Sequence, residues 1–330
     1  MYIVFGLILF LIFFIFYYYL AYKFNIMDVP NTRKTHKNPT PLIGGLCIFS
    51  TLYLVIYFFF ELDPEVNIIV LGSFFILIIG FIDDFRTVKA YLRLSLQFFI
   101  VCIVVWFGIY IVDIGEYSFL PINNLGFIGI VLTLFSVLCL VNAINFIDGM
   151  DGLSISLIVI ILINIYLNIQ KQATIDEINF ILLLIFLSLI FLLLNIGAFP
   201  KYKIFLGDAG STSFGFIIAF LLVFFTIPEK RYFDPVLCIW IVTLPMFDLL
   251  NVILMRIFNN NKIYHPDRNH VHHILLKKGF TNIQVLFVLI SLSITLNVIG
   301  HLIHYNFGSD IALVAFVFIY LLYSISLKRL

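Results

Sequence analysis

Long apolar runs alternate with short polar segments along the whole chain. Because about 17 to 25 apolar residues cross a bilayer as a helix, the pattern predicts eleven helices. No repeat, linker or low-complexity segment divides them, so we expect one integral membrane domain over 1–330 with an all-α polytopic fold. The predicted helices lie near 2–22, 42–60, 67–82, 96–112, 125–145, 153–169, 178–197, 206–226, 235–257, 283–304 and 311–327.

Composition supports the same class of protein. Of 330 residues, 63% are hydrophobic and 11% are charged, which is too apolar for a soluble core of this size. The weak alternation expected of a membrane β-barrel is absent. The N-terminal run lacks a basic region and a small-residue cleavage site, so we interpret it as a retained first span. The four cysteines lie in apolar runs and form no CxxC pair, which indicates packing residues.

The basic residues are distributed unevenly among the loops. Sixteen of the 19 Lys and Arg residues fall in alternate loops or at the C-terminus, and only Lys171, Lys230 and Arg231 fall in the others. Basic residues favour the cytoplasmic side of a membrane. We therefore expect the N-terminus outside and the C-terminus in the cytoplasm.

Five polar clusters interrupt the apolar pattern, and this orientation puts all of them on the cytoplasmic face. We therefore expect the loops that carry them to form one site. The clusters are 28-DVPNTRKTHKNPTPLIGG-45, 80-GFIDDFRTVKAYLR-93, 142-NAINFIDGMDG-152, 205-FLGDAGS-211 and 265-HPDRNHVHH-273.

The second cluster places two carboxylates at the end of the third helix. Adjacent residues on a helix point about 100° apart, so Asp83 and Asp84 are expected to play different parts. One would approach a cation or a phosphoryl group, while a base such as Lys89 or Arg93 would anchor the other. The plain alternative is a helix end where charge returns to water.

The third and fourth clusters offer oxygen ligands. Asn142, Asn145 and Asp148 share one face if the fifth helix continues through them. Amide and carboxylate oxygens suit Mg²⁺, which keeps several waters and takes few protein ligands. Asp208, at the start of the eighth helix, would complete such a site opposite Asn145, with phosphate oxygens as further ligands. The alternatives are a tight turn between two spans and, for Asp208, a simple N-cap.

The remaining clusters are basic. Arg268 with the histidines at 265, 270, 272 and 273 forms a suitable clamp for phosphate, and HExxH and accompanying cysteines, which would indicate zinc, are missing. The alternative is a set of histidines that lines an interface. Lys34 and His36 repeat the basic theme in the first loop, where an ordinary positive-inside loop is the alternative. Asp248 lies well inside a span, so it is either buried against a partner such as Arg256 or close to the site.

Acids for Mg²⁺, cations for phosphates and an apolar wall beside both suit phosphoryl transfer between a soluble phosphate donor and a lipid phosphate. The ordered motifs DxPNxRKxH…PxxGG, GFxDD, NAxNxxDGxDGL, LGDxGS and HPDRxHxHHxLL resemble the polyprenyl-phosphate N-acetylhexosamine-1-phosphate transferase family. The resemblance runs from about Asp28 to Leu276 and is strongest to the undecaprenyl-phosphate N-acetylglucosamine-1-phosphate transferases. These enzymes start O-antigen, lipopolysaccharide, enterobacterial common antigen and teichoic acid synthesis. The phospho-MurNAc-pentapeptide translocase is a more distant relative.

The resemblance implies an enzyme of the bacterial cytoplasmic membrane that transfers a HexNAc-1-phosphate, most simply GlcNAc-1-phosphate, from a UDP-sugar to undecaprenyl phosphate and releases UMP. Asn145 and Asp208 would hold Mg²⁺, with Mn²⁺ as an alternative, and Asp83 or Asp84 would position or deprotonate the lipid phosphate. The residues expected to bind the substrates are Lys34, His36, Asn142, Asp148, Asp151, Arg268, His270, His272 and His273.

A second hypothesis is a cation-coupled secondary transporter with Asp248 and other acids as an ion path. Transporters bind near the midplane and often contain paired repeats, whereas these carboxylates gather at one face. No nucleic acid partner is expected. The sequence leaves open which N-acetylhexosamine is carried, which polysaccharide is made, whether the chain forms a homodimer, and which of Asp83 and Asp84 does the positioning.

Overall fold

The computed structural model describes residues 1–29, 39–119, 124–258 and 270–329. Lys34, His36 and Arg268 lie outside these ranges. The helices are α1 (Tyr2–Phe24), α2 (Gly44–Phe59), α3 (Pro64–Phe85), α4 (Ala90–Trp106), α5 (Phe127–Ile147), α6 (Leu153–Ile169), α7 (Ile175–Asn195), α8 (Gly207–Phe224), α9 (Val236–Ile241), α10 (Thr243–Phe258), α11 (Val271–Lys277) and α12 (Asn282–Arg329). A two-stranded pair, β1 (Met27–Asp28) and β2 (Thr40–Pro41), and a 3₁₀ turn at Pro200–Tyr202 complete the elements.

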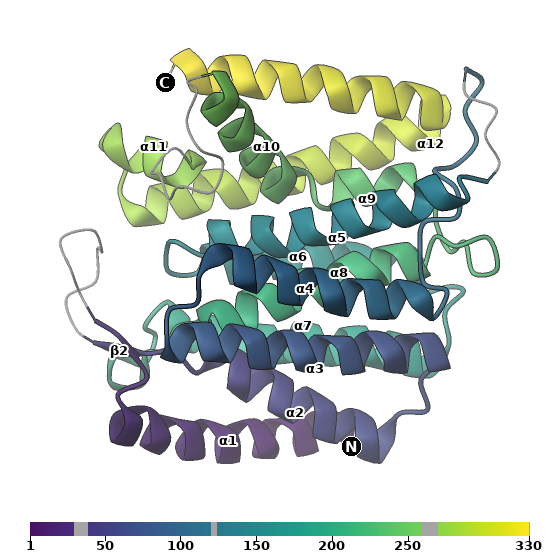
Figure 1. Ribbon diagram of the computed structural model, residues 1–330. Helices are drawn as coiled ribbons and strands as arrows, with labels where there is room; N and C mark the ends of the chain where they lie inside the picture. Colours follow the sequence, from purple (N-terminus) through teal and green to yellow (C-terminus); the bar gives the residue numbers. More distant parts are fainter. Residues whose placement is uncertain (30–38, 120–123, 259–269, 330) are drawn as a thin grey trace.

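The predicted all-α membrane fold is confirmed. In the part of the chain that the structure describes, six helices are long and apolar enough to cross a membrane, namely α1, α3, α5, α7, α8 and α12, and the apolar helices α2, α4 and α6 are shorter. The helices lie side by side in a layered bundle, with the N-terminus at one end and the C-terminus at the other (Figure 1). The exact number of spans and the orientation stay predictions.

Three predicted helices differ in detail. The predicted helix 235–257 is divided at Val242, whose backbone is non-helical (φ −102°, ψ 18°). Pro245 accounts for the break, because proline has no N–H to donate to the carbonyl of Ile241. The predicted helices 283–304 and 311–327 both lie within α12, which turns at Gly308 (φ 80°, ψ −178°). That positive φ favours glycine.

Helix α8 forms the centre of the bundle. In the apolar stretch of α8, 94% of the residues are buried, whereas in that of α1 only 11% are buried. Small residues let neighbouring backbones approach it closely. A Cβ added to Gly45 of α2 would lie 2.3 Å from the Gly210 nitrogen, and one on Gly80 of α3 would lie 2.5 Å from the Ala209 Cα. This close packing fixes the start of α8 against the end of α3.

Short backbone pairings shape the same end of the bundle. Met27 pairs with Pro41 and Asp28 with Thr40, which closes the first loop. Leu42 then forms a parallel bridge with Phe205, just before α8. The loop between α1 and α2 is thereby joined to the segment that carries Asp208.

The opposite end of the bundle is held by ion pairs. Lys230 contacts Asp63 at 2.6 Å and Glu177 at 3.2 Å, and Glu177 is almost fully buried. Arg231 pairs with Asp113. Two of the three basic residues predicted to face outward therefore tie together the loops before α3 and α5 and the first turn of α7.

Candidate active site

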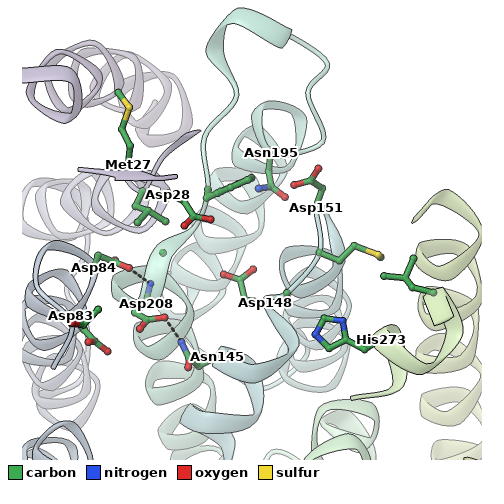
Figure 2. Close-up of a pocket in the computed structure, with 17 residues that line it drawn as sticks. Met27, Asp28, Asp83, Asp84, Asn145, Asp148, Asp151, Asn195, Asp208 and His273 are labelled. Carbon is green, nitrogen blue, oxygen red and sulfur yellow. Dashed lines mark hydrogen bonds between the residues drawn. The ribbon is translucent and has the colours of Figure 1, made fainter. Parts of the chain in front are cut away.

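A pocket of about 520 Å³ lies where several helices end, a size within the usual range for small-ligand sites. Six aspartates line it together with Asn145, Asn195 and His273, and Figure 2 shows their side chains gathered around one space. They come from β1, from α3, α5, α7, α8 and α11, and from the turn after α5. The six aspartates are Asp28, Asp83, Asp84, Asp148, Asp151 and Asp208.

The adjacent acids at the end of α3 have different partners. Asp83 accepts a hydrogen bond from the Val88 amide at 2.7 Å and pairs with Arg93 at 2.6 Å. Asp84 accepts the backbone N–H groups of Asp208 at 2.8 Å and Ala209 at 3.0 Å. Of the two bases considered from the sequence, Arg93 is the one that contacts Asp83.

Asp84 therefore caps α8. Its carboxyl oxygens accept two of the N–H groups at the start of the helix, as a capping side chain does. The turn before α8 depends on Gly207, which has a φ of 76°. A Cβ on that residue would also lie 2.5 Å from Asp84 Oδ2. Glycine is required at this position both for the backbone conformation and for the approach of the carboxylate.

Asp208 is the meeting point of three elements. Its Oδ1 accepts a hydrogen bond from the Asn145 amide at 2.7 Å, and its Oδ2 contacts Arg93 at 3.0 Å. Asn145 also donates to Ser211 at 2.9 Å. The Asp208 side chain is 35% exposed, so it reaches the pocket. The structure thus brings Asp83 and Asp208 to one guanidinium group and Asn145 to Asp208.

Asp208 and Asn145 are candidate ligands for a divalent cation. Within the described ranges, no group of three or more His, Cys, Asp or Glu side chains is arranged to hold a metal by itself. Asp208 and Asn145 nevertheless supply a carboxylate and an amide in contact at the pocket wall. Such a partial set fits Mg²⁺, which usually takes one or two carboxylates and completes its shell with substrate phosphates and water.

The segment after α5 supplies two more acids. Helix α5 ends at Ile147, so the polar face expected through Asp148 stops at Asn145. Ser154 donates a hydrogen bond to Asp148, whose pKa is raised to about 7 by burial and by the nearby charges of Asp208 and Asp151. Asp151 pairs with Lys203 at 2.5 Å.

The prediction that Asn142 belongs to the site is wrong, and Asn195, which the sequence analysis did not name, lines the pocket instead. The Asn142 amide donates to its own helix at the Leu138 carbonyl, and Asn142 is not among the residues that line the pocket. Asn195 lines it and links two loops, because it accepts the Gly152 N–H at 2.6 Å and donates to the Ile204 carbonyl at 3.0 Å. Sequence reasoning missed Asn195. Its signal was a lone amide at the end of the apolar run before 196-IGAFP-200.

The three histidines at 270, 272 and 273 occupy different environments. His270 pairs through Nδ1 with Asp248 Oδ2 at 2.7 Å, so His270 is a partner of the buried acid, for which the sequence suggested Arg256. His272 is fully buried against Gly149, and burial lowers its pKa to about 3, with help from His273 and His270. At neutral pH it carries no positive charge for a phosphate. His273 lines the pocket.

The fold and the pocket define a multi-pass membrane protein with an acidic site at the ends of its helices. Comparison with known proteins defines it further. Residues 66–226 match the family described as glycosyl transferase family 4. Curated relatives align over 94% of the chain, so the chain belongs to this family and is an enzyme of the phosphoglycosyl transferase type. Nothing in these relatives supports a transporter.

Three relatives illustrate the likeness, and each is named undecaprenyl-phosphate alpha-N-acetylglucosaminyl 1-phosphate transferase. The protein of Escherichia coli (strain K12) is 31% identical over 320 residues, which cover 85% of its length. That of Haemophilus influenzae is 32% identical over 323 residues and 88% of its length. That of Yersinia pestis is 30% identical over 318 residues and 86% of its length. The family resemblance inferred from the motifs is confirmed.

Proposed function

We propose that this enzyme transfers N-acetylglucosamine-1-phosphate from UDP-N-acetylglucosamine to undecaprenyl phosphate at the cytoplasmic face of a bacterial cytoplasmic membrane. The observation that carries the proposal is the likeness, over 94% of the chain, to enzymes named for this transfer. The pocket supports it, because six aspartates and Asn145 line a space where several helices end, which a soluble donor and a membrane lipid can both reach.

The reaction exchanges one pyrophosphate bond for another. An oxygen of the lipid phosphate attacks the sugar-bearing phosphorus of the donor and forms the new P–O–P bond. The old P–O–P bond breaks, and its electron pair leaves with UMP. The lipid phosphate is already ionised at neutral pH, so neither acid of α3 has to remove a proton from it. Asp84 is in any case occupied as the cap of α8.

The residues of the pocket would bind the metal and the phosphates. Asp208 and Asn145 would hold Mg²⁺, which would neutralise charge on the transferring phosphates. Arg93 contacts Asp83 at 2.6 Å and Asp208 at 3.0 Å. It would place a positive charge beside the transferring phosphates. With a pKa of about 7, Asp148 carries a proton in part of the molecules at neutral pH and can then donate a hydrogen bond to a phosphate oxygen.

Purified protein in detergent tests this function directly. With undecaprenyl phosphate, Mg²⁺ and UDP-N-acetylglucosamine it should release UMP, and Asp208→Ala should abolish the release. Asp310→Asn is a matched control. Asp310 lies in α12, accepts a hydrogen bond from the Ser118 N–H and does not line the pocket. Unchanged thermal unfolding of Asp208→Ala would separate loss of chemistry from loss of fold.

The donor and the metal are tested in the same assay. UDP-N-acetylgalactosamine and other UDP-HexNAc donors each replace UDP-N-acetylglucosamine in parallel reactions. Chelation of the metal should abolish UMP release, and addition of Mg²⁺ or Mn²⁺ should restore it. If wild-type protein releases UMP from none of these donors, the proposed function is wrong. Full activity of Asp208→Ala, or of the chelated protein, would remove the metal site from it.

A further inference from the structure

We propose that Asp248 is a positioning residue that fixes how the histidine segment, defined as residues 270–273, meets the pocket. The inference rests on the proposed function, because it assigns to this segment a part in holding the phosphate donor. Asp248 lies on α10, is 2% exposed and does not line the pocket. It therefore acts through other residues and not by touching the reacting groups.

Both carboxylate oxygens of Asp248 are used on the start of α11. Oδ2 contacts the His270 ring at Nδ1 at 2.7 Å, and Oδ1 accepts the Val271 N–H at 2.7 Å. His270 is the N-cap residue of α11, with an extended backbone (φ −67°, ψ 148°) and no capping bond from its own side chain. The acid on α10 supplies what the local sequence does not, since it accepts a free N–H at the start of the helix.

Apolar packing by itself leaves the rotation of α11 less defined. Val271 and Leu275 are buried in one apolar cluster with Leu244 of α10 and Val285 of α12. These contacts are non-directional, so they hold the depth of the short helix better than its rotation. A buried carboxylate with two hydrogen bonds of fixed geometry removes that freedom.

The rotation of α11 decides where the next two histidines lie. His272 lies over Gly149 in the turn that carries Asp148, with Nε2 2.6 Å from where a Cβ would be. His273 lines the pocket, and its ring lies 4.1 Å from that of His272. Asp248 is thus connected through His270 and Val271 to the donor side of the pocket.

The ring pairing also selects a tautomer. A carboxylate only accepts hydrogen bonds, so the Nδ1 that contacts Asp248 carries the proton. An asparagine amide at 248 has the same shape and keeps one oxygen to accept the Val271 N–H. In its other tautomer, the His270 ring can accept a hydrogen bond at Nδ1 from the amide NH₂ group. Asparagine should therefore preserve much of the positioning, whereas alanine should lose it.

Steady-state kinetics of the full-length protein test the proposal. Asp248→Ala should raise KM and the equilibrium Kd for UDP-N-acetylglucosamine about tenfold, as expected for the loss of a charge-assisted hydrogen bond, with a smaller change in kcat. Asp248→Asn should recover most of this loss. The Asp248→Ala/His270→Ala double variant should have a donor Kd no higher than that of the single variant with the higher Kd, because both substitutions remove the same link.

Asn251→Ala is the matched control on the same helix. Asn251 is fully buried like Asp248, but it accepts a hydrogen bond from Ser324 of α12 at 3.0 Å instead of holding α11. It should lower the unfolding temperature and leave the donor KM unchanged. If Asp248→Ala behaves in the same way, or if the effects of Asp248→Ala and His270→Ala on Kd are additive, Asp248 is merely structural.

A second readout does not depend on catalysis. The Nδ1–H proton of His270 should give a low-field NMR signal without substrates, absent from His270→Ala and from Asp248→Ala and retained in Asn251→Ala. Wild-type protein without that signal would overturn the pairing. A wild type inactive with every UDP-HexNAc would overturn the proposed function and the donor role together, whereas an active wild type with unchanged donor KM in Asp248→Ala overturns this proposal alone.

Discussion

Gly149 shows how a single missing side chain shapes the pocket. It comes directly after Asp148 in the turn after α5, and the His272 ring occupies the space where its Cβ would be. Its backbone φ is not in the left-handed region, so only the lack of space requires glycine there. The chain uses this position to bring the buried imidazole against the acidic turn.

Gly149→Ala should therefore displace the His272 ring and raise the donor KM. Overpacking of this kind costs about 1 to 3 kcal/mol, so the unfolding temperature should fall as well. The Gly149→Ala/His272→Ala double variant restores the space and should recover stability relative to Gly149→Ala. A Gly149→Ala protein with normal donor KM and normal unfolding would contradict the contact.

Asp148 makes stability depend on pH. Its pKa is raised to about 7 in the folded protein, chiefly by burial, and lies near 4 in the unfolded chain. Between these values the folded state binds more protons than the unfolded state, so this group's contribution to stability is lost as pH rises from about 4 to about 7. Asp148→Asn removes the titrating group.

With metal chelated, Asp148→Asn should therefore stabilise the protein relative to wild type more at about pH 8 than at about pH 5. Thermal unfolding in detergent at both pH values measures the difference. Asp310→Asn, whose acid lies at the other end of the bundle, should show no such trend. An equal effect of Asp148→Asn at the two pH values would contradict the raised pKa.

At the scale of elements, the contact between α3 and α8 couples packing to the site. Gly80 lies against the backbone of Asp208 and Ala209, and Asp84 caps those same residues one turn later on α3. The close approach allowed by the glycine is what brings the carboxylate within reach of both amides.

Gly80→Ala should push α3 away from α8, because its Cβ would lie 2.5 Å from Ala209 Cα and backbone cannot move aside as a side chain does. We expect a loss of about 1 to 3 kcal/mol in stability and a fall in kcat. Gly6→Ala on α1 is the matched control, since its Cβ would meet only side-chain atoms, the nearest being the end of Leu183 at 3.3 Å. Equal unfolding temperatures for the two variants would refute the packing argument.

The extent of the helices could be predicted from the sequence because long apolar runs leave few alternatives in a membrane. The break at Val242 was missed although Pro245 signals it, since the run stays apolar across it. The short helix α11 and the β1–β2 pair are too brief to produce a periodic pattern. They are fixed by tertiary contacts such as those of Asp248 and Phe205.

The site could be predicted from the sequence to a similar degree. Polar clusters in an apolar chain pointed to Asp83, Asp208 and Asn145, and the acid–base pairing with Arg93 could be anticipated from nearby residues. The Asp248–His270 pair could not, because its members lie 22 residues apart on different elements. Nor could the hydrogen bond from Asn142 to the Leu138 carbonyl, since helical spacing gives a face but not a hydrogen-bond partner.

The whole molecule has two chemically distinct ends. One end gathers six aspartates around the pocket. The other is tied by Lys230 to Asp63 and Glu177 and by Arg231 to Asp113. In Figure 1 the two termini lie at opposite ends of the bundle. The distribution of basic loops predicts that the pocket end faces the cytoplasm, where nucleotide sugars are available.

Single cysteines in a chain whose four native cysteines are replaced by alanine test this orientation. Lys171, between α6 and α7, and Arg86, after α3, are both exposed and belong to opposite ends. In spheroplasts an impermeant maleimide should label Lys171→Cys at once and Arg86→Cys only after permeabilisation, because basic loops are retained in the cytoplasm. The reverse result would put the pocket on the outer face, away from any cytosolic donor, and would leave the acidic site without its proposed substrate.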